Sequence, residues 1–353
     1  MATLRVDASG GDVAECGMRI HHLGLPPSAQ RSFVDQYSCF DTGPNHMRVL
    51  VVALVMAVPT VLGGQARAPA GSSRAVIGAD TAGLRRTLDS IARAHRGVVG
   101  YTAHNLDTGE RLSLRGDEKF PTASLIKVAV LVTLFHLVEK GAMSLDDRLT
   151  MSKIDKVPGS GTLQHMHDNL ELTVRDAAWL MSTTSDNTAT NLILDKVGIR
   201  RVWEKMDSLG LPQTRIHAKV FLARYTSLVP DSTAKYGLGV TTPNEMARLF
   251  ALMADGRAVS ARADSAMLDI LRHNEDYQMM QRHVSGVRAP RKTGATDQVR
   301  AECALFHLQS RIAACALTRE NQDRRWLIDN EAQVTLARIG QAIVGAWPKA
   351  GGR

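Results

Sequence analysis

Residues 128–138 form an almost continuous apolar run, and it follows directly after a short segment that contains Ser124 and Lys127. A helix that is apolar on every side belongs in a core, and this run is too short to span a bilayer. Residues three apart on a helix share a face, so we expect the Ser124 hydroxyl and the Lys127 amine to meet. Burial of the Lys127 cation is costly, which predicts a lowered pKa for that amine.

The hydrophobic spacing elsewhere predicts a helical middle between two sets of strands. Helices are predicted at 80–94, 121–140, 172–180, 187–197, 243–253, 263–272 and 326–347, and strands at 98–104, 111–115, 291–293, 300–307 and 311–318. Thr173 is expected to cap the helix at 172–180. Residues 214–242 show few periodic signals and are predicted to be a long loop, a feature that is often functional in compact domains. Strands at both ends favour an α+β fold.

The N-terminal part of the chain differs from the rest. Residues 1–46 lack periodicity, which predicts a loop or disorder. Residues 47–68 combine a basic start, an apolar stretch and small residues at the end, the pattern of a secretory signal peptide. Because signal peptides begin at the initiator methionine, we expect translation to start at Met47 and the prefix to be a gene-start error. The alternative is a cytoplasmic tail with a signal anchor, against which Pro59 argues.

The remaining chain divides into a linker, residues 69–78, and one domain, residues 79–348. We expect a sheet lobe from 79–119 and 264–348, and a helical lobe from 120–263. After removal of the signal peptide no membrane span is expected.

Composition excludes some partners. Hydrophobic residues make up 44% and charged residues 22% of the chain, which suits a soluble globular protein. The net charge of +8 is scattered along the chain, and aromatic residues are only 5%, so there are few platforms on which bases would stack. We therefore expect no nucleic acid as a partner. We also expect a monomer.

Cysteines and histidines leave two minor questions. Cys303 and Cys315 lie on neighbouring predicted strands, where either a disulfide, if the protein is exported, or two free buried thiols would fit. His165, His167 and Asp168 suggest a metal site, but no convincing further ligand or second motif accompanies them. We expect no metal and no other cofactor.

Three short motifs occur in order: Ser-x-x-Lys at 124–127, Ser-Asp-Asn at 185–187 and Lys-Thr-Gly at 292–294. They fall at a helix start, in a loop before a helix, and on a strand. A second Ser-x-x-Lys match, at 232–235, has no buried helix behind it and shows how weak the first motif is alone. The conjunction of all three is what indicates a specific chemistry.

With these motifs the chain resembles the serine β-lactamase and penicillin-binding-protein family, and most closely its class A branch. The resemblance runs from about 81 to 346 and is strongest at 120–127, 172–192 and 291–295. It implies an antiparallel sheet flanked by terminal helices, an all-helical lobe, and catalysis through an acyl-enzyme.

The family's catalytic roles fall on four side chains. Ser124 would attack a lactam or peptide carbonyl, and Lys127 would accept its proton as a neutral amine. Lys292 would lower the pKa of Lys127 by like-charge repulsion. Ser185 would bridge the two lysines and pass a proton to the leaving nitrogen.

The remaining candidates would bind the substrate. Asn187 would bind its side-chain amide, and the backbone N–H groups of Ser124 and Ala295 would form the oxyanion hole. Thr293 with Lys292 would hold its carboxylate, with Gly294 beside them on the strand. Arg300 is a looser candidate for the same anion. Asp186 is expected to fix the loop by hydrogen bonds.

The chain departs from class A at one position of consequence. Class A relatives carry a glutamate in the loop after the Ser-Asp-Asn helix, where it activates the deacylating water. Residues 219–223 contain no acid, and no glutamate occurs between Glu204 and Glu245. His217 and Tyr225 are the candidates to substitute for it. Residues 158–161 also lack the aromatic that relatives often place at the cleft rim.

Without the glutamate, acylation can proceed while release slows, since general-base help is worth roughly a hundred- to ten-thousandfold. Three interpretations remain: a class A-like β-lactamase, a D-alanyl-D-alanine peptidase or related hydrolase or esterase acting on peptidoglycan peptides or small esters, and a β-lactam sensor that stays acylated.

Overall fold

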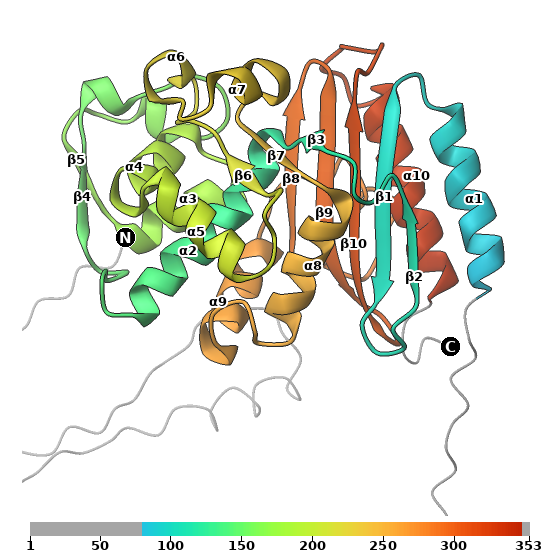
Figure 1. Ribbon diagram of the computed structural model, residues 1–353. Coiled ribbons are helices and arrows are strands. Elements are labelled where there is room, and N and C mark those ends of the chain that lie inside the picture. The colour runs from blue at the N-terminus through green and yellow to red at the C-terminus, as the bar shows by residue number, and fades with distance from the viewer. Residues whose placement is uncertain (1–79, 348–353) are drawn as a thin grey trace, which may run out of the picture. The chain divides into compact units, whose positions relative to one another are not determined.

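A five-stranded antiparallel sheet forms the centre of the protein in a computed structural model, which describes residues 80–347. The predicted prefix, signal peptide and linker lie outside the described residues. The sheet contains β1 (Val98–Asn105), β2 (Arg111–Leu114), β8 (Arg291–Thr296), β9 (Val299–His307) and β10 (Arg311–Arg319). Their order is β2-β1-β10-β9-β8, so strands from both ends of the domain build one sheet, as the sequence predicted (Figure 1).

Helices α1 (Thr81–Ala94) and α10 (Glu331–Ala346) pack on one face of this sheet (Figure 1). Leu88 of α1, Phe306 of β9 and Leu336 of α10 belong to the same buried cluster. The predicted closing helix was too long at its N-terminus. Asn330 caps α10 by accepting hydrogen bonds from the backbone of the helix, so the residues from Trp326 onwards remain in the preceding loop.

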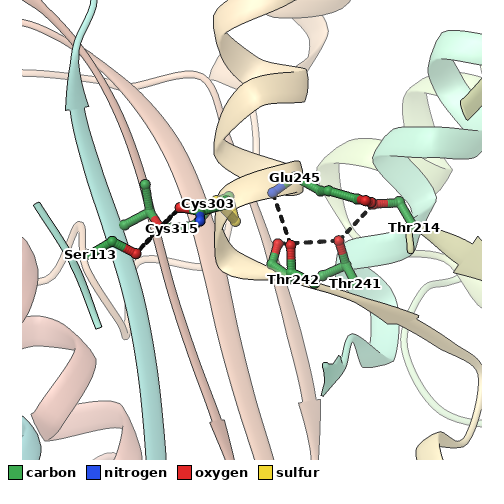
Figure 2. The surroundings of a disulfide bond; sticks show 9 residues. Ser113, Thr214, Thr241, Thr242, Glu245, Cys303 and Cys315 are labelled. Atoms are coloured by element: carbon green, nitrogen blue, oxygen red, sulfur yellow. Dashed lines mark hydrogen bonds between the residues drawn. A yellow bond between two sulfur atoms is a disulfide. The ribbon is translucent and has the colours of Figure 1, made fainter. Parts of the chain in front are cut away.

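The opposite face of the sheet packs against α8 (Pro243–Ala254) and the helical lobe (Figure 1). Side chains of β9 alternate between the two cores, with Cys303 on the helical-lobe side and Ala304 on the other. Cys303 and Cys315 face each other across β9 and β10 and form a disulfide, which decides between the two states left open by the sequence. Figure 2 shows this bond close to the first turn of α8.

The helical lobe is built around α2 (Lys127–Glu139), in which every residue from Lys127 to Phe135 is buried. A 3₁₀ turn, Ala123–Ile126, precedes this helix. Ser124 therefore lies in the 3₁₀ turn, whereas the sequence had placed it in the first turn of the helix itself. Lys127 is the first residue of α2.

Around α2 lie α3 (Val174–Thr183), α4 (Asn187–Val197), α5 (Ile199–Ser208) and α9 (Ala261–Arg272). The capping role predicted for Thr173 is confirmed, because its hydroxyl accepts from the Asp176 backbone N–H at the start of α3. Helix α5 was not predicted. No helix within residues 80–347 is long and apolar enough to cross a membrane.

The lobe is not all-helical, contrary to the expectation. β4 (Arg148–Met151) pairs with β5 (Leu170–Thr173), and a second small sheet has the order β3-β7-β6, from β3 (Phe120–Pro121), β7 (Gly239–Thr241) and β6 (Arg215–Ile216). The segment predicted as a long loop thus contains β6 and β7, and also two short helices, α6 (Ala223–Thr226) and α7 (Pro230–Tyr236). Each of these elements is too short to leave a periodic pattern.

Candidate active site

Two buried lysines converge on one serine at the junction of sheet and helices. Lys127 Nζ donates to the backbone oxygen of Ser185 at 2.7 Å and lies 3.3 Å from its Oγ. Lys292 Nζ donates to the same Oγ at 3.0 Å and to the Thr293 carbonyl oxygen at 2.8 Å. The structure therefore brings together three of the four side chains to which the sequence assigned catalytic roles.

Each of the three is held by a different element. Lys127 opens α2, Lys292 lies on β8, and Ser185 lies between α3 and α4 with a φ of 58°, in the left-handed region. Asp186 fixes that junction, as predicted. Its carboxylate accepts hydrogen bonds from three backbone N–H groups, those of Thr162 at 2.7 Å, Leu163 at 2.9 Å and Ala189 at 2.9 Å.

The electrostatics of the site disfavour two charged lysines. Burial, reinforced by the positive charge of Lys292, holds the pKa of Lys127 well below its usual value. Burial also lowers the pKa of Lys292 to about 8, although the carboxylates of Asp276 and Glu302 oppose that shift. The arrangement thus favours a neutral amine at Lys127 over two charged lysines side by side.

Ser124 lines a cavity of about 710 Å³. Asn187 and Ala295 line the same cavity. The Asn187 amide is already held on both sides, because its Oδ1 accepts from Lys127 Nζ at 2.9 Å and its Nδ2 donates to the Pro158 carbonyl at 2.9 Å. The nucleophile candidate and two of the binding candidates therefore share one open space.

Gly294 allows β8 to pack directly on the turn that carries Ser124. A Cβ atom at Gly294 would lie 2.2 Å from the Thr122 carbonyl oxygen and 3.0 Å from the Ser124 nitrogen. Only glycine permits this approach. It sets the backbone of Ala295, the next residue, beside the backbone of Ser124. Thr293, on the same strand, is only 5% exposed.

Arg300, the looser candidate for the substrate anion, is not among the residues that line the cavity. The guanidinium is buried, donates to the carbonyl oxygens of Thr296, Val299 and Arg325, and lies 4.5 Å from the centre of the Trp326 ring. These contacts fix the loop before α10 against the β8–β9 turn.

Neither His217 nor Tyr225 faces the cavity from the loop after α5. His217 is buried, with its Nδ1 2.9 Å from the Gly237 carbonyl oxygen and its Nε2 3.1 Å from Ser232 Oγ. Tyr225 is 79% exposed and does not line the cavity. The wall that this loop contributes consists of Ala218, Lys219, Val220, Phe221 and Ala223, none of which is an acid.

Two aromatic side chains that line the cavity were not singled out as site residues from the sequence. Phe221 has a left-handed φ of 58°, and its ring would be 3.2 Å from a Cβ placed at Gly159. Trp326 lines the cavity as well and donates from Nε1 to Asp297 at 2.7 Å. The weak sequence signal for Phe221 was an aromatic residue within a segment that has few periodic signals.

The other sequence suggestions lie elsewhere. In the second Ser-x-x-Lys match, Ser232 contacts His217, and the exposed Lys235 lies beside the Tyr236 ring. Asp168, from the suggested metal site, forms an ion pair with Lys156 at 2.7 Å. Within the described part of the chain no group of three or more metal-ligating side chains occurs.

Comparison with known proteins connects this geometry to a family. A family model described as "Beta-lactamase enzyme family" matches residues 83–347. A beta-lactamase from Streptomyces cellulosae is 28% identical over 208 residues, 58% of this chain and 64% of that protein. Beta-lactamase L2 from Stenotrophomonas maltophilia is 32% identical over 109 residues, 31% of this chain and 36% of that protein. The chain thus spans between about a third and two thirds of the length of these relatives.

Solved structures match over nearly their whole length. A beta-lactamase from Sphaerobacter thermophilus has 29% identity and a TM-score of 0.67, covering 76% of this chain and 97% of that chain. PBP-A has 27% identity and a TM-score of 0.65, covering 75% and 95%. A mutant of PBP-A, with 26% identity and a TM-score of 0.66 over 75% and 96%, was captured as an acyl-enzyme with penicillin G.

Proposed function

Because this chain belongs to the beta-lactamase enzyme family, we propose that it is an exported serine hydrolase of class A type that opens β-lactam rings through an acyl-enzyme on Ser124. One observation carries the proposal. Lys127 and Lys292, which both have lowered pKa values, contact Ser185, and Lys127 also donates to Asn187, which lines the same cavity as Ser124.

The hydrogen bonds at Lys127 suit a neutral amine. Such an amine has two N–H groups and one lone pair. The backbone oxygen of Ser185 and the Oδ1 of Asn187 only accept hydrogen bonds, so they take the two N–H groups. The lone pair is then available to a hydroxyl, which is what a general base for Ser124 requires.

Acylation follows from these contacts. Ser124 Oγ bonds to the lactam carbonyl carbon, and its proton passes to Lys127 Nζ. The backbone N–H groups of Ser124 and Ala295 stabilise the developing oxyanion. As the lactam C–N bond breaks, Ser185 gives its proton to the leaving nitrogen and receives one from Lys127. Lys292, which donates to Ser185 Oγ, remains cationic and with Thr293 binds the substrate carboxylate.

Release of the acyl group is expected to be slow. Hydrolysis needs a base that deprotonates the attacking water, and the cavity wall at residues 218–223 offers no carboxylate. This feature favours a second candidate function, a D-alanyl-D-alanine peptidase or a penicillin-binding sensor. The similarity to PBP-A, whose mutant holds penicillin G as an acyl-enzyme, supports it too.

Export is part of the proposal. The signal peptide at 47–68 lies outside the described residues, but the Cys303–Cys315 disulfide supports an oxidising compartment such as the periplasm. We also propose that the mature protein acts as a monomer.

The test is covalent labelling with a fluorescent penicillin, followed by intact mass over time. We expect one adduct on the wild-type protein and on Ser232→Ala, which changes the second Ser-x-x-Lys match, and none on Ser124→Ala. An unlabelled wild-type protein that is folded would refute the proposal. Decay of the adduct with turnover of a chromogenic cephalosporin identifies a β-lactamase, whereas a lasting adduct with D-alanine release from a peptide identifies a peptidase. A lasting adduct without either activity supports a sensor.

A further inference from the structure

A buried ion pair lies on β8 and β9, and none of the steps above uses it. Glu302 and Arg291 are both fully buried, with Glu302 Oε1 3.7 Å from Arg291 Nε. Glu302 Oε2 accepts a hydrogen bond from the Met280 backbone, whereas Oε1 has no hydrogen-bond partner. A buried carboxyl oxygen without a hydrogen bond destabilises the folded protein, so the presence of Glu302 at this position calls for an explanation.

The Arg291 guanidinium ties the segment between α9 and β8 to the sheet. It donates to the carbonyl oxygens of Asp276 at 3.1 Å, Asn274 at 2.5 Å and Ala289 at 3.4 Å. It also lies 4.0 Å from the centre of the Tyr277 ring. Arg291 directly precedes Lys292, so the residue that anchors this segment is covalently joined to one of the two lysines at Ser185.

The same segment also holds the end of α3. Asn274 Nδ2 donates to the Ser182 carbonyl oxygen at 3.0 Å, and the Glu275 N–H donates to the Thr183 carbonyl oxygen at 3.1 Å. Ser185 comes two residues after the last residue of α3. Glu302 and Arg291 are thus connected both to the strand that carries Lys292 and to the helix end that leads into Ser185.

The charge of Glu302 also affects the pKa of Lys292. Burial raises the pKa of Glu302 to about 8, an effect that the Arg291 cation opposes and the Asp276 carboxylate reinforces. On β10 the residue paired with Glu302 is Ala316, which carries no charge. The Glu302 carboxylate in turn raises the pKa of Lys292, so loss of its charge would make Lys292 easier to deprotonate.

We propose that Glu302, which pairs with the neighbour of Lys292 across β8 and β9, is a positioning residue for the Lys292–Ser185 contact, which it fixes through Arg291 and the 274–280 segment. At alkaline pH, where Glu302 is ionised, its carboxylate also helps to keep Lys292 cationic. The inference rests on the proposed acyl transfer at Ser124. It assigns a purpose to a buried acid that stability alone does not require, because a buried ion pair is often no better than apolar packing.

The first test is the pH dependence of penicillin labelling in Glu302→Gln, a change that keeps the shape and removes the charge. Deprotonation of Lys292 should set the alkaline limb of the labelling rate. We expect this limb to move to lower pH by about one unit in the variant. Glu171→Gln, which removes an exposed glutamate on β5, should leave the limb in place. If Glu302→Gln folds and labels with the same alkaline limb as the wild-type protein, the proposed effect of the Glu302 charge on Lys292 is refuted.

The second test covers the case in which Glu302→Gln does not fold. Asn274→Ala removes the amide that holds the end of α3 and keeps the ion pair. We expect labelling to slow by about ten- to a hundredfold at every pH, with the alkaline limb unchanged. Labelling at the wild-type rate overturns the positioning role. If the wild-type protein does not label, the proposed function is refuted. If the wild-type protein labels and both variants behave like it, only this inference is refuted.

Discussion

Lys127 Nζ lies 2.7 Å from the backbone oxygen of Ser185, a residue whose φ of 58° is unusual for a side chain larger than glycine. Such a conformation costs of order 1–3 kcal/mol and persists only where the surroundings enforce it. Lys127 therefore holds the backbone of Ser185 and also contacts its hydroxyl. One side chain thus positions Ser185 and takes part in its proton transfer.

A pair of substitutions at Ser185 separates its two properties. Ser185→Ala and Ser185→Gly both remove the hydroxyl, so each should slow penicillin labelling by about a hundred- to ten-thousandfold. Glycine also relieves the left-handed backbone and should make the protein more stable than the alanine variant by about 1 kcal/mol. Stopped-flow labelling and urea unfolding measure the two effects. Labelling of Ser185→Ala at the wild-type rate would contradict the bridging role.

The rate of labelling should depend on pH in a bell shape. Lys127 must be neutral to act as a base, so the rate falls as pH drops through its lowered pKa. Lys292 must be cationic to bind the carboxylate, so the rate also falls as pH rises through about 8. Lys292→Arg, whose guanidinium stays charged, should retain labelling above that pH. An alkaline limb identical in both proteins would assign it to another group.

Gly294→Ala should disable the site without a change in any functional side chain. The new Cβ would fall 2.2 Å from the Thr122 carbonyl oxygen, so β8 must move away from the turn that carries Ser124. We expect labelling to slow by about a hundredfold or more. Gly345→Ala, in α10 where a Cβ meets no atom within 4 Å, is the matched control and should label normally. Normal labelling of both variants would disprove this packing argument.

The disulfide should stabilise the protein without serving the chemistry. Cys303 and Cys315 are separated by only 12 residues along the chain, and a loop of that size predicts a contribution of about 3 kcal/mol. Urea unfolding with and without reductant measures it. The double variant Cys303→Ala/Cys315→Ala should be less stable than the oxidised protein, and its urea unfolding midpoint should not change when reductant is added. A wild-type midpoint that reductant does not move would indicate free thiols.

The sequence revealed the residues whose roles depend on local spacing. Lys127, Asn187 and the cap Thr173 were all found because a helix start has a local pattern that neighbouring residues specify. The family resemblance that the three motifs carry then implied which of these elements meet. The architecture of a sheet built from both ends also followed, since long strands leave recognisable runs of apolar residues.

The features that the sequence did not predict depend on contacts between segments that are far apart in the chain. β6 and β7 are only a few residues long and exist because they pair with each other and with β3. The direction of the Arg300 side chain is set by Trp326 and by carbonyl oxygens of other loops, which a strand pattern cannot report. Phe221 and Trp326 became site residues only when the folded chain placed both at one cavity.

The pairing of β1 with β10 constrains how the protein is made. Val98 lies opposite Arg319, so the middle of the sheet joins segments about two hundred residues apart. At a typical rate of about 5–20 residues per second, a ribosome needs tens of seconds to supply the second partner. Until then β1 has an unpaired edge, and aggregation during synthesis or translocation is the hazard that chaperones would have to control.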